Sequence, residues 1–151
     1  EFIPLGADID FFKPDYKIPS ENFIFSIGRD VGRDFKTLFK ATKKSKIPIK
    51  IITNRINIKN LKIPSNAEIY TEQINYPTLI DWYKKAHLVI LNIEEIHRFS
   101  GQRALLEALA MGKTIISAKT KSLTSTYNLK NEKEIIFYKP GDSNDLKNKI
   151  N

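Results

Sequence analysis

Short runs of apolar residues alternate with segments of helical periodicity along most of this 151-residue chain. The apolar runs lie at positions 23–27, 49–53, 67–70, 87–91, 114–118 and 134–138. Between them, apolar residues recur at helical spacing, as at Phe35, Leu38 and Phe39. Apolar strands separated by helices are typical of a parallel sheet that is covered on both faces. The alternation therefore predicts an α/β fold, a Rossmann-like doubly wound parallel sheet of about six strands.

The stretch from Ser100 to Ser117 is the clearest candidate for a ligand site. It predicts a loop containing Gly101, a helix, a left-handed glycine cap at Gly112 and a short buried strand. The first turn of a helix carries unpartnered N–H groups and the positive end of the helix dipole, so a phosphate is a natural ligand there. Glu107 lies roughly two turns further along, where a carboxylate could hold a ribose. The same unit occurs in most α/β proteins, however, and a single helix glutamate is more often solvated.

Three segments that follow predicted strands carry polar residues or glycine. They are Gly28-Arg29, the loop after Tyr70, and Ser100-Gly101-Gln102. In doubly wound folds, ligands bind at the carboxyl ends of the strands. We therefore expect these segments to converge on one anion site at that edge of the sheet.

The composition narrows the classes of partner. The formal net charge is +8, which favours polyanions, anionic lipid surfaces or phosphorylated ligands without choosing between them. The basic residues are scattered along the chain and are not interleaved with aromatic residues, which argues against a dedicated nucleic-acid module. The chain has no cysteine and two histidines, so disulfides and thiolate metal sites are excluded and a histidine-rich metal site is disfavoured.

Four parts of the chain, in order, resemble the motifs of one known family. They are Ile3 to Pro14 (IPLGADIDFFKP), Phe25 to Arg29 with Arg33 to Leu38, Leu105 to Lys113 (LLEALAMGK), and Phe137 to Leu146 (FYKPGDSNDL). They are similar to motifs in the C-terminal, donor-binding domain of GT-B-fold retaining glycosyltransferases, the group 1 glycosyltransferase family. The similarity covers nearly the whole chain, so it is more specific than any single motif.

The resemblance implies a domain organisation and an activity. Residues 1–20 would be an inter-domain segment and linker, and residues 21–151 a nucleotide-sugar-binding domain, the C-terminal half of a GT-B fold without its N-terminal acceptor domain. The whole enzyme would transfer a hexose from a UDP- or GDP-linked sugar to a glycan or a lipid-linked acceptor, as in polysaccharide biosynthesis. This fragment alone would be inactive. The resemblance also implies a cytoplasmic protein, with or without peripheral membrane contact, and no nucleic-acid partner, metal or cofactor besides the nucleotide-sugar substrate.

The resemblance also assigns roles to particular residues. Arg29, and Arg33 in place of the family's lysine, would have the catalytic role of binding the donor diphosphate and assisting its departure. A guanidinium suits this role because it is always charged and forked. Glu107 matches the second glutamate of the family's E-x(7)-E motif and would accept hydrogen bonds from the ribose. The other expected contacts are to phosphate, from Gly28, Ser100, Gly101 and Gln102, and to the base, from Ile74, Asn75 and Tyr76.

The sequence also departs from the family pattern. Phe99 stands eight residues before Glu107, where the family has a glutamate that faces the hexose, and Glu94 and Glu95 are out of register with that position. A second hypothesis is therefore a non-catalytic nucleotide-binding or protein-interaction module that retains the half-fold. Polyanion binding through net charge is a third, and a sugar-nucleotide epimerase, which would need acid/base residues at the site, a fourth. His97 is either an exposed loop residue or a ligand of the phosphates.

Overall fold

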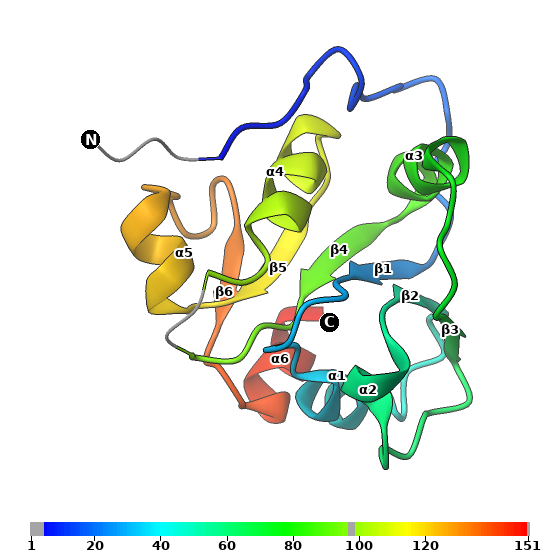
Figure 1. Cartoon of the computed structure of the whole chain (residues 1–151), viewed down its shortest axis with the longest axis vertical. Helices are drawn as coiled ribbons and strands as arrows, with labels where there is room; N and C mark the ends of the chain where they lie inside the picture. Colours follow the sequence, from blue (N-terminus) through cyan, green and yellow to red (C-terminus); the bar gives the residue numbers. More distant parts are fainter. Residues whose placement is uncertain (1–4, 97–98, 151) are drawn as a thin grey trace.

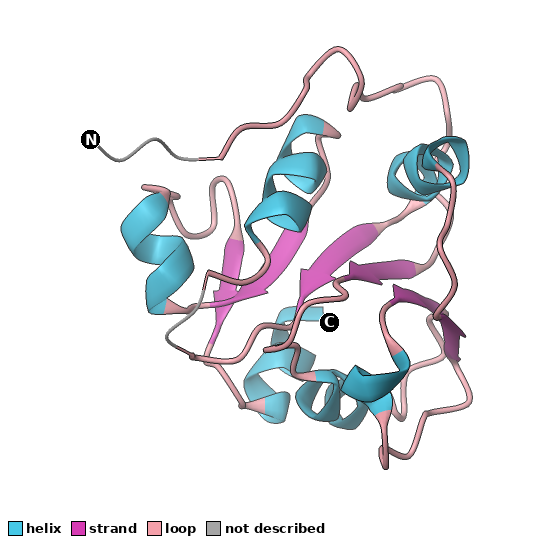
Figure 2. Ribbon diagram, viewed as in Figure 1, coloured by secondary structure: helices cyan, strands magenta, loops and turns pink. Residues whose placement is uncertain are grey.

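A computed structural model describes residues 5–96 and 99–150 and confirms the predicted α/β architecture. One sheet runs in the order β3-β2-β1-β4-β5-β6, and each neighbouring pair of strands is parallel (Figures 1 and 2). The strands are β1 (Ile24–Ile27), β2 (Ile49–Ile52), β3 (Ala67–Tyr70), β4 (Leu88–Leu91), β5 (Ile115–Ala118) and β6 (Ile136–Tyr138). Each lies within an apolar run identified in the sequence. The predicted role of His97 and the first residues of the inter-domain motif lie outside the described residues.

Helices connect the strands and cover the sheet. They are α1 (Phe35–Thr42), α2 (Arg55–Ile58), α3 (Tyr76–Lys85), α4 (Gln102–Ala110), α5 (Lys121–Thr126) and α6 (Ser143–Ile150). Helix α1 packs beside α6, and these two lie on the opposite face of the sheet from α3 and α4 (Figure 1). This two-sided cover explains why β4 is apolar at every position and β1 at every position except Ser26.

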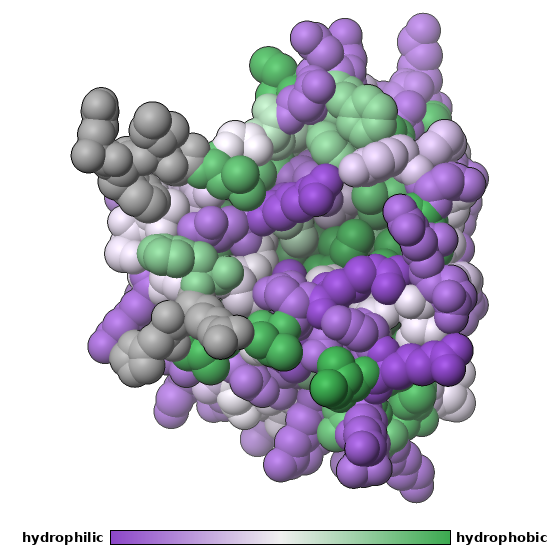
Figure 3. Space-filling view, in the orientation of Figure 1, coloured by the Kyte–Doolittle hydropathy of each residue, from purple (hydrophilic) through white to green (hydrophobic). Residues whose placement is uncertain are grey.

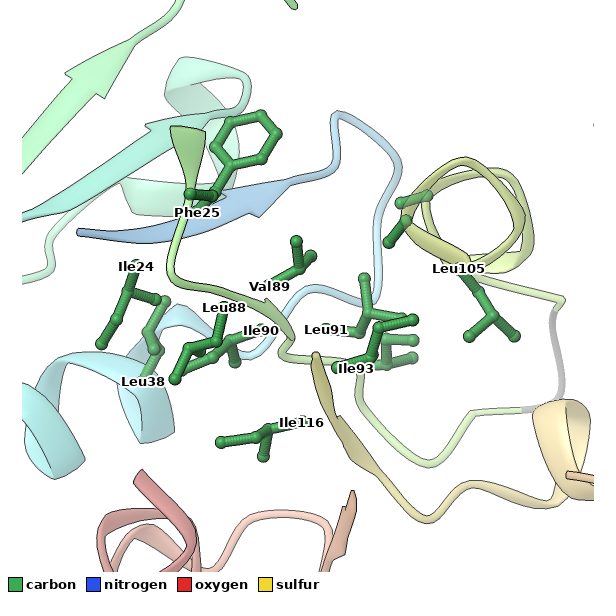
Figure 4. Close-up of a cluster of buried hydrophobic side chains, with 14 of the residues drawn as sticks. Ile24, Phe25, Leu38, Leu88, Val89, Ile90, Leu91, Ile93, Leu105 and Ile116 are labelled. Carbon is green, nitrogen blue, oxygen red and sulfur yellow. The ribbon is translucent and has the colours of Figure 1, made fainter. Parts of the chain in front are cut away.

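The core follows the alternation of side chains along β1 and β4. Ile24 points toward Leu38 of α1, whereas its neighbour Phe25 points to the opposite face (Figure 4). Val89 pairs in register with Phe25 and points to the same face. Because successive strand residues face opposite sides, a strand between two helical layers has no solvent-facing position. All four of these side chains are fully buried.

Several helices begin or end at residues that stabilise helix termini. The Asp34 carboxylate accepts a hydrogen bond from the backbone N–H of Thr37 and caps α1. Asn75 caps α3 in the same way, and Pro77 lies in the first turn, where a proline is tolerated. Gly112, with φ +63°, follows α4 in the left-handed conformation predicted for it. The caps at Asp34 and Asn75 fix where the loops that follow β1 and β3 end.

The N-terminal segment packs on the domain without forming a helix or strand in its described part. Phe12 is buried against Tyr83, with ring centroids 6.3 Å apart, and Phe11 contacts Tyr76 edge-to-face at 5.3 Å. The Ser20 hydroxyl donates a hydrogen bond to the carbonyl of Ala86 at 3.2 Å. The segment predicted as a linker is therefore anchored to α3 and to the residues that follow it.

Candidate functional site

A cavity of about 610 Å³ lies at the carboxyl ends of β1 and β2, between the N-terminal turns of α3 and α4. The residues that line it come from both strand ends, from the loop after β3 and from the two helices: Ile27, Gly28, Arg29, Asp30, Arg33, Ile52, Gln73, Ile74, Asn75, Tyr76, Pro77, Leu79, Arg103, Ala104 and Glu107. Figure 3 shows the hollow near the centre of this face, with an apolar floor and hydrophilic side chains along its sides. This is the edge at which doubly wound folds bind their ligands.

Short backbone contacts join the loops that follow β1 and β4. Arg33 and Ile93 form an antiparallel bridge. The N–H of Asp34 donates to the carbonyl of Asn92 at 2.8 Å, and the N–H of Glu94 donates to the carbonyl of Gly32 at 2.9 Å. These contacts hold the segment carrying Arg33 beside the chain that leads into α4.

Arg33 is a buried charged group of the cavity, with 4% of its side chain exposed. Its Nε and Nη2 atoms donate hydrogen bonds to Asp30 Oδ1 at 2.9 and 2.8 Å. Its Nη1 atom is buried and has no hydrogen-bond partner within residues 5–96 and 99–150. Gly28 leaves room for this side chain, because a Cβ at Gly28 would lie 2.0 Å from Arg33 Nε. A buried, unpartnered guanidinium nitrogen calls for an explanation, and an anionic ligand is one.

The start of α4 lies close to this nitrogen. Gly101 is the N-cap residue, with φ +78° and no side-chain cap. A Cβ at Gly101 would lie 3.6 Å from Arg33 Nη1. The positive end of the helix dipole and a buried cation thus meet at one point, which is the arrangement that an anion requires. Ser100 contributes differently, because its hydroxyl donates a hydrogen bond to Asp30 Oδ2.

Arg29 forms one rim of the cavity. Its guanidinium donates hydrogen bonds to the carbonyl oxygens of Thr71 and Glu72 in the loop after β3. The side chain therefore connects the end of β1 to the end of β3. Its charge remains at the cavity because carbonyl groups do not neutralise it.

Glu107 is buried, with 4% exposure, so the interpretation of this residue as a solvated helix glutamate is wrong. Its Oε1 accepts a hydrogen bond from Arg103 Nε at 3.0 Å, and its Oε2 accepts one from the hydroxyl of Tyr83, also at 3.0 Å. Burial and the neighbouring Glu107 carboxylate raise the pKa of Tyr83 well above its ordinary value. The phenol therefore stays a donor and holds the carboxylate in place. Each carboxylate oxygen can accept a further hydrogen bond, and Glu107 lines the cavity.

The structure brings together most of the residues that the sequence nominated. Gly28, Arg29, Arg33, Tyr76 and Glu107 line the cavity, as do Ile74 and Asn75 of the expected base-binding loop. Ser100, Gly101 and Gln102 do not line it and lie at the start of α4. Their predicted contacts with phosphate, like the other assigned roles, stay predictions.

Two charged residues of the cavity were missed by the sequence analysis. Asp30 follows Arg29 directly. Its position three residues before Arg33 could have indicated an ion pair between the two side chains. Arg103 precedes Glu107 by four residues, the spacing of a helical ion pair, and also donates to the Tyr76 hydroxyl at 3.3 Å. Hydrogen bonds to Tyr76 and Glu107 raise the pKa of Arg103.

The acidic residues near Phe99 do not replace the missing glutamate of the family motif. Phe99 is 64% exposed. The Glu95 carboxylate accepts a hydrogen bond from the backbone N–H of Lys121 at 3.0 Å, on the side of α5, and Glu94 is exposed. Neither glutamate lines the cavity. Among the described residues, no group of His, Asp and Glu is arranged to hold a metal ion, and no helix is long and apolar enough to cross a membrane.

A second concavity, of about 720 Å³, lies between α1 and the loop before β3. Five lysines line it, although they are scattered along the sequence: Lys36, Lys40, Lys43, Lys44 and Lys62. Their side chains are exposed, so Lys36 and Lys40 form a solvated face of α1. Phe39, the aromatic residue of this lysine groove, is 4% exposed and offers no free ring face for stacking with a base.

The clearance at Gly28 provides a test of the Arg33 position. Gly28→Ala would place a Cβ about 2 Å from the guanidinium, so we expect a loss of about 1–3 kcal/mol in the free energy of unfolding. Gly6→Ala is the matched control, because nothing lies within 4 Å of a Cβ there. Chemical denaturation measures both variants. Equal stability of the two variants would contradict the described packing. If Gly28→Ala costs less stability in an Arg33→Ala background than in the unaltered protein, the contact with Arg33 is confirmed as the cause of the loss.

Comparison with known proteins adds to this geometry. No protein-family model and no curated protein match the sequence. Among solved structures, the C-terminal domain of a glycosyl transferase group 1 family protein (LpcC) from Francisella tularensis is 16% identical, with a TM-score of 0.70 over 96% of this chain and 86% of that one. A glycosyltransferase from Rickettsia africae is 20% identical, with a TM-score of 0.71 over 96% of this chain and 44% of that one.

A third similar structure is that of HepE from Anabaena in complex with UDP and glucose, 15% identical, with a TM-score of 0.74 over 96% of this chain and 44% of that one. The chain thus spans less than half the length of the Rickettsia and Anabaena proteins. At these identities the similarity concerns the fold. The chain has the Rossmann-like fold of the C-terminal domain of GT-B glycosyltransferases.

Proposed function

We propose that this chain is the donor-binding domain of a retaining glycosyltransferase, which binds a nucleotide diphosphate sugar in the cavity between α3 and α4. The observation that carries the proposal is the unpartnered Nη1 of buried Arg33 beside the start of α4. A diphosphate would complete the coordination of that nitrogen. The resemblance of the fold to the HepE structure with UDP and glucose supports the same ligand class.

Each part of a nucleotide sugar has a place in this proposal. The diphosphate lies against Arg33 and the first turn of α4, with Arg29 at the rim. The ribose hydroxyls donate to Glu107, whose carboxylate is held by Tyr83. The base lies against the loop that ends at Tyr76.

The positive charge at the diphosphate would stabilise the departing group as the bond to the sugar breaks. Arginines and a helix end can do this without a metal. The acceptor, a glycan or a lipid-linked sugar, would bind on a second domain, so this chain alone would bind the donor and transfer nothing. We place the enzyme in the cytoplasm, where nucleotide sugars are made, with peripheral membrane contact when the acceptor is lipid-linked.

A second candidate is a nucleotide-binding module without catalytic activity. The exposed Phe99, in place of the glutamate that faces the hexose in the family, favours it. The two candidates share the nucleotide site and differ in the sugar. They are separated by comparing the affinities for a nucleotide diphosphate and for its sugar conjugates, because a donor site gains contacts from the sugar and a nucleotide module does not.

The proposed ligand class is tested by thermal unfolding with UDP, GDP, ADP and their hexose conjugates, without added metal. A ligand at one hundred times its dissociation constant stabilises a protein by about 2.7 kcal/mol, which is a shift of several degrees for a domain of this size. We expect one nucleotide series to shift the midpoint and the others to leave it unchanged. If no nucleotide shifts it, the donor-site proposal is wrong for the isolated domain.

The ribose contact is tested separately from the phosphate contact. Glu107→Gln keeps the side-chain volume and removes the charge, so we expect at least a tenfold loss of affinity for the nucleotide, about 1.4 kcal/mol. Affinity for inorganic pyrophosphate should stay within twofold, because the ribose contact is absent from that ligand. Asp81→Asn, which changes a half-buried acid paired with Lys85, is the control for the loss of one negative charge. Isothermal titration gives both constants, and an equal loss for both ligands would contradict the ribose assignment.

A further inference from the structure

Asp30 places a carboxylate inside a site that is otherwise built for an anion. Its Oδ1 accepts two hydrogen bonds from Arg33, and its Oδ2 accepts one from the hydroxyl of Ser100, at the loop that leads into α4. A guanidinium edge, a hydroxyl and a nearby helix start are the groups that would bind a phosphate oxygen. In this structure they hold a side chain of the protein itself.

The two partners of this ion pair differ in their freedom to move. The Arg33 side chain is 4% exposed, whereas that of Asp30 is 42% exposed. The backbone at Asp30 is held, because its carbonyl accepts a hydrogen bond from Asn57 Nδ2 at 3.0 Å. The Asp30 carboxylate can therefore reach water by rotating its side chain, while the guanidinium stays buried.

The Asp30 carboxylate and an anionic ligand would compete for the Arg33 guanidinium. A buried cation without a counter-ion would be costly, so the empty site needs the carboxylate. When a diphosphate reaches Nη1, two anions share one guanidinium, and like charges at such short distances repel each other. The Asp30 carboxylate has access to water, so it is the group that leaves the guanidinium.

We propose that Asp30 is an exchangeable counter-ion, which neutralises Arg33 in the empty site and moves into solvent when the phosphate of the ligand binds. This inference rests on the proposed function, since it concerns the same anion site. It deepens that proposal by defining the ligand: a group must outcompete a carboxylate to enter, so doubly charged phosphates are favoured over carboxylates and other single anions.

The inference predicts that removing the charge of Asp30 strengthens anion binding. In Asp30→Asn the side chain keeps its size and an oxygen for Arg33, but its competition for the cation is reduced. We expect the affinity for inorganic pyrophosphate and for UDP to rise about tenfold. Asp81→Asn, which removes an acid on the exposed face of α3, is the matched control and should change neither. Unchanged binding by Asp30→Asn would overturn the inference, because Asp30 would then not compete with the ligand. Weaker binding would also overturn it, because Asp30 would then position Arg33 for the ligand.

A second measurement on the unaltered protein covers the case in which Asp30→Asn does not fold. In the empty protein, burial raises the pKa of Asp30, but the charge of Arg33 and the hydrogen bonds from Ser100 and Arg33 outweigh it and keep the pKa below its ordinary value. If phosphate displaces the carboxylate, saturating pyrophosphate should raise this pKa, as followed by the ¹³C resonance of the carboxyl group. A pKa that stays low in the complex would contradict the exchange.

The outcomes also separate this inference from the proposed function. If UDP binds the unaltered and the Asp30→Asn proteins equally well, the inference fails and the donor site stands. If pyrophosphate binds the variant more tightly but no nucleotide binds either protein, the inference stands and the donor site fails. If neither ligand binds either protein, both fail.

Discussion

The ion pair between Arg33 and Asp30 is the interaction on which the rest of the site depends. A guanidinium with 4% exposure is stable only if a carboxylate and a close-fitting backbone surround it. Gly28 provides the space, and the antiparallel bridge between Arg33 and Ile93 brings the loop after β1 to the loop before α4. Arg33 Nη1, which has no hydrogen-bond partner among the described residues, lies close to Gly101 at the start of α4.

Much of the fold could be predicted because burial of a sheet on both faces produces a simple sequence pattern, in which continuous apolar strands alternate with helices that are apolar on one side. β1 and β4 contain apolar residues at every position except Ser26, and the helices between strands keep a one-sided pattern. The glycine cap at Gly112 was also predicted, because it acts on its own neighbours, whereas the equally local cap at Asp34 was found only in the structure. The exact first and last residues of the strands were not predicted, since β6 begins at Ile136 although the apolar run begins two residues earlier.

The site was predicted only in part, because its geometry depends on contacts between distant segments. Glu107 lies opposite Leu105 on its helix, so periodicity alone suggests exposure. Tyr83 and Arg103 bury it instead, and Tyr83 comes from another helix. Gly28 could be predicted as part of a phosphate loop, but the space that it leaves for the Arg33 side chain is visible only in the three-dimensional structure. The lysines of the lysine groove likewise come together only in three dimensions.

The central claim of this account is that a diphosphate binds between Arg33 and the first turn of α4. A crystal structure of the domain with UDP, grown without metal ions, tests this most directly. The account predicts a phosphate oxygen within about 3 Å of Arg33 Nη1 and the ribose against Glu107. A nucleotide bound in the lysine groove, or bound in the cavity with its phosphates away from Arg33, would contradict it.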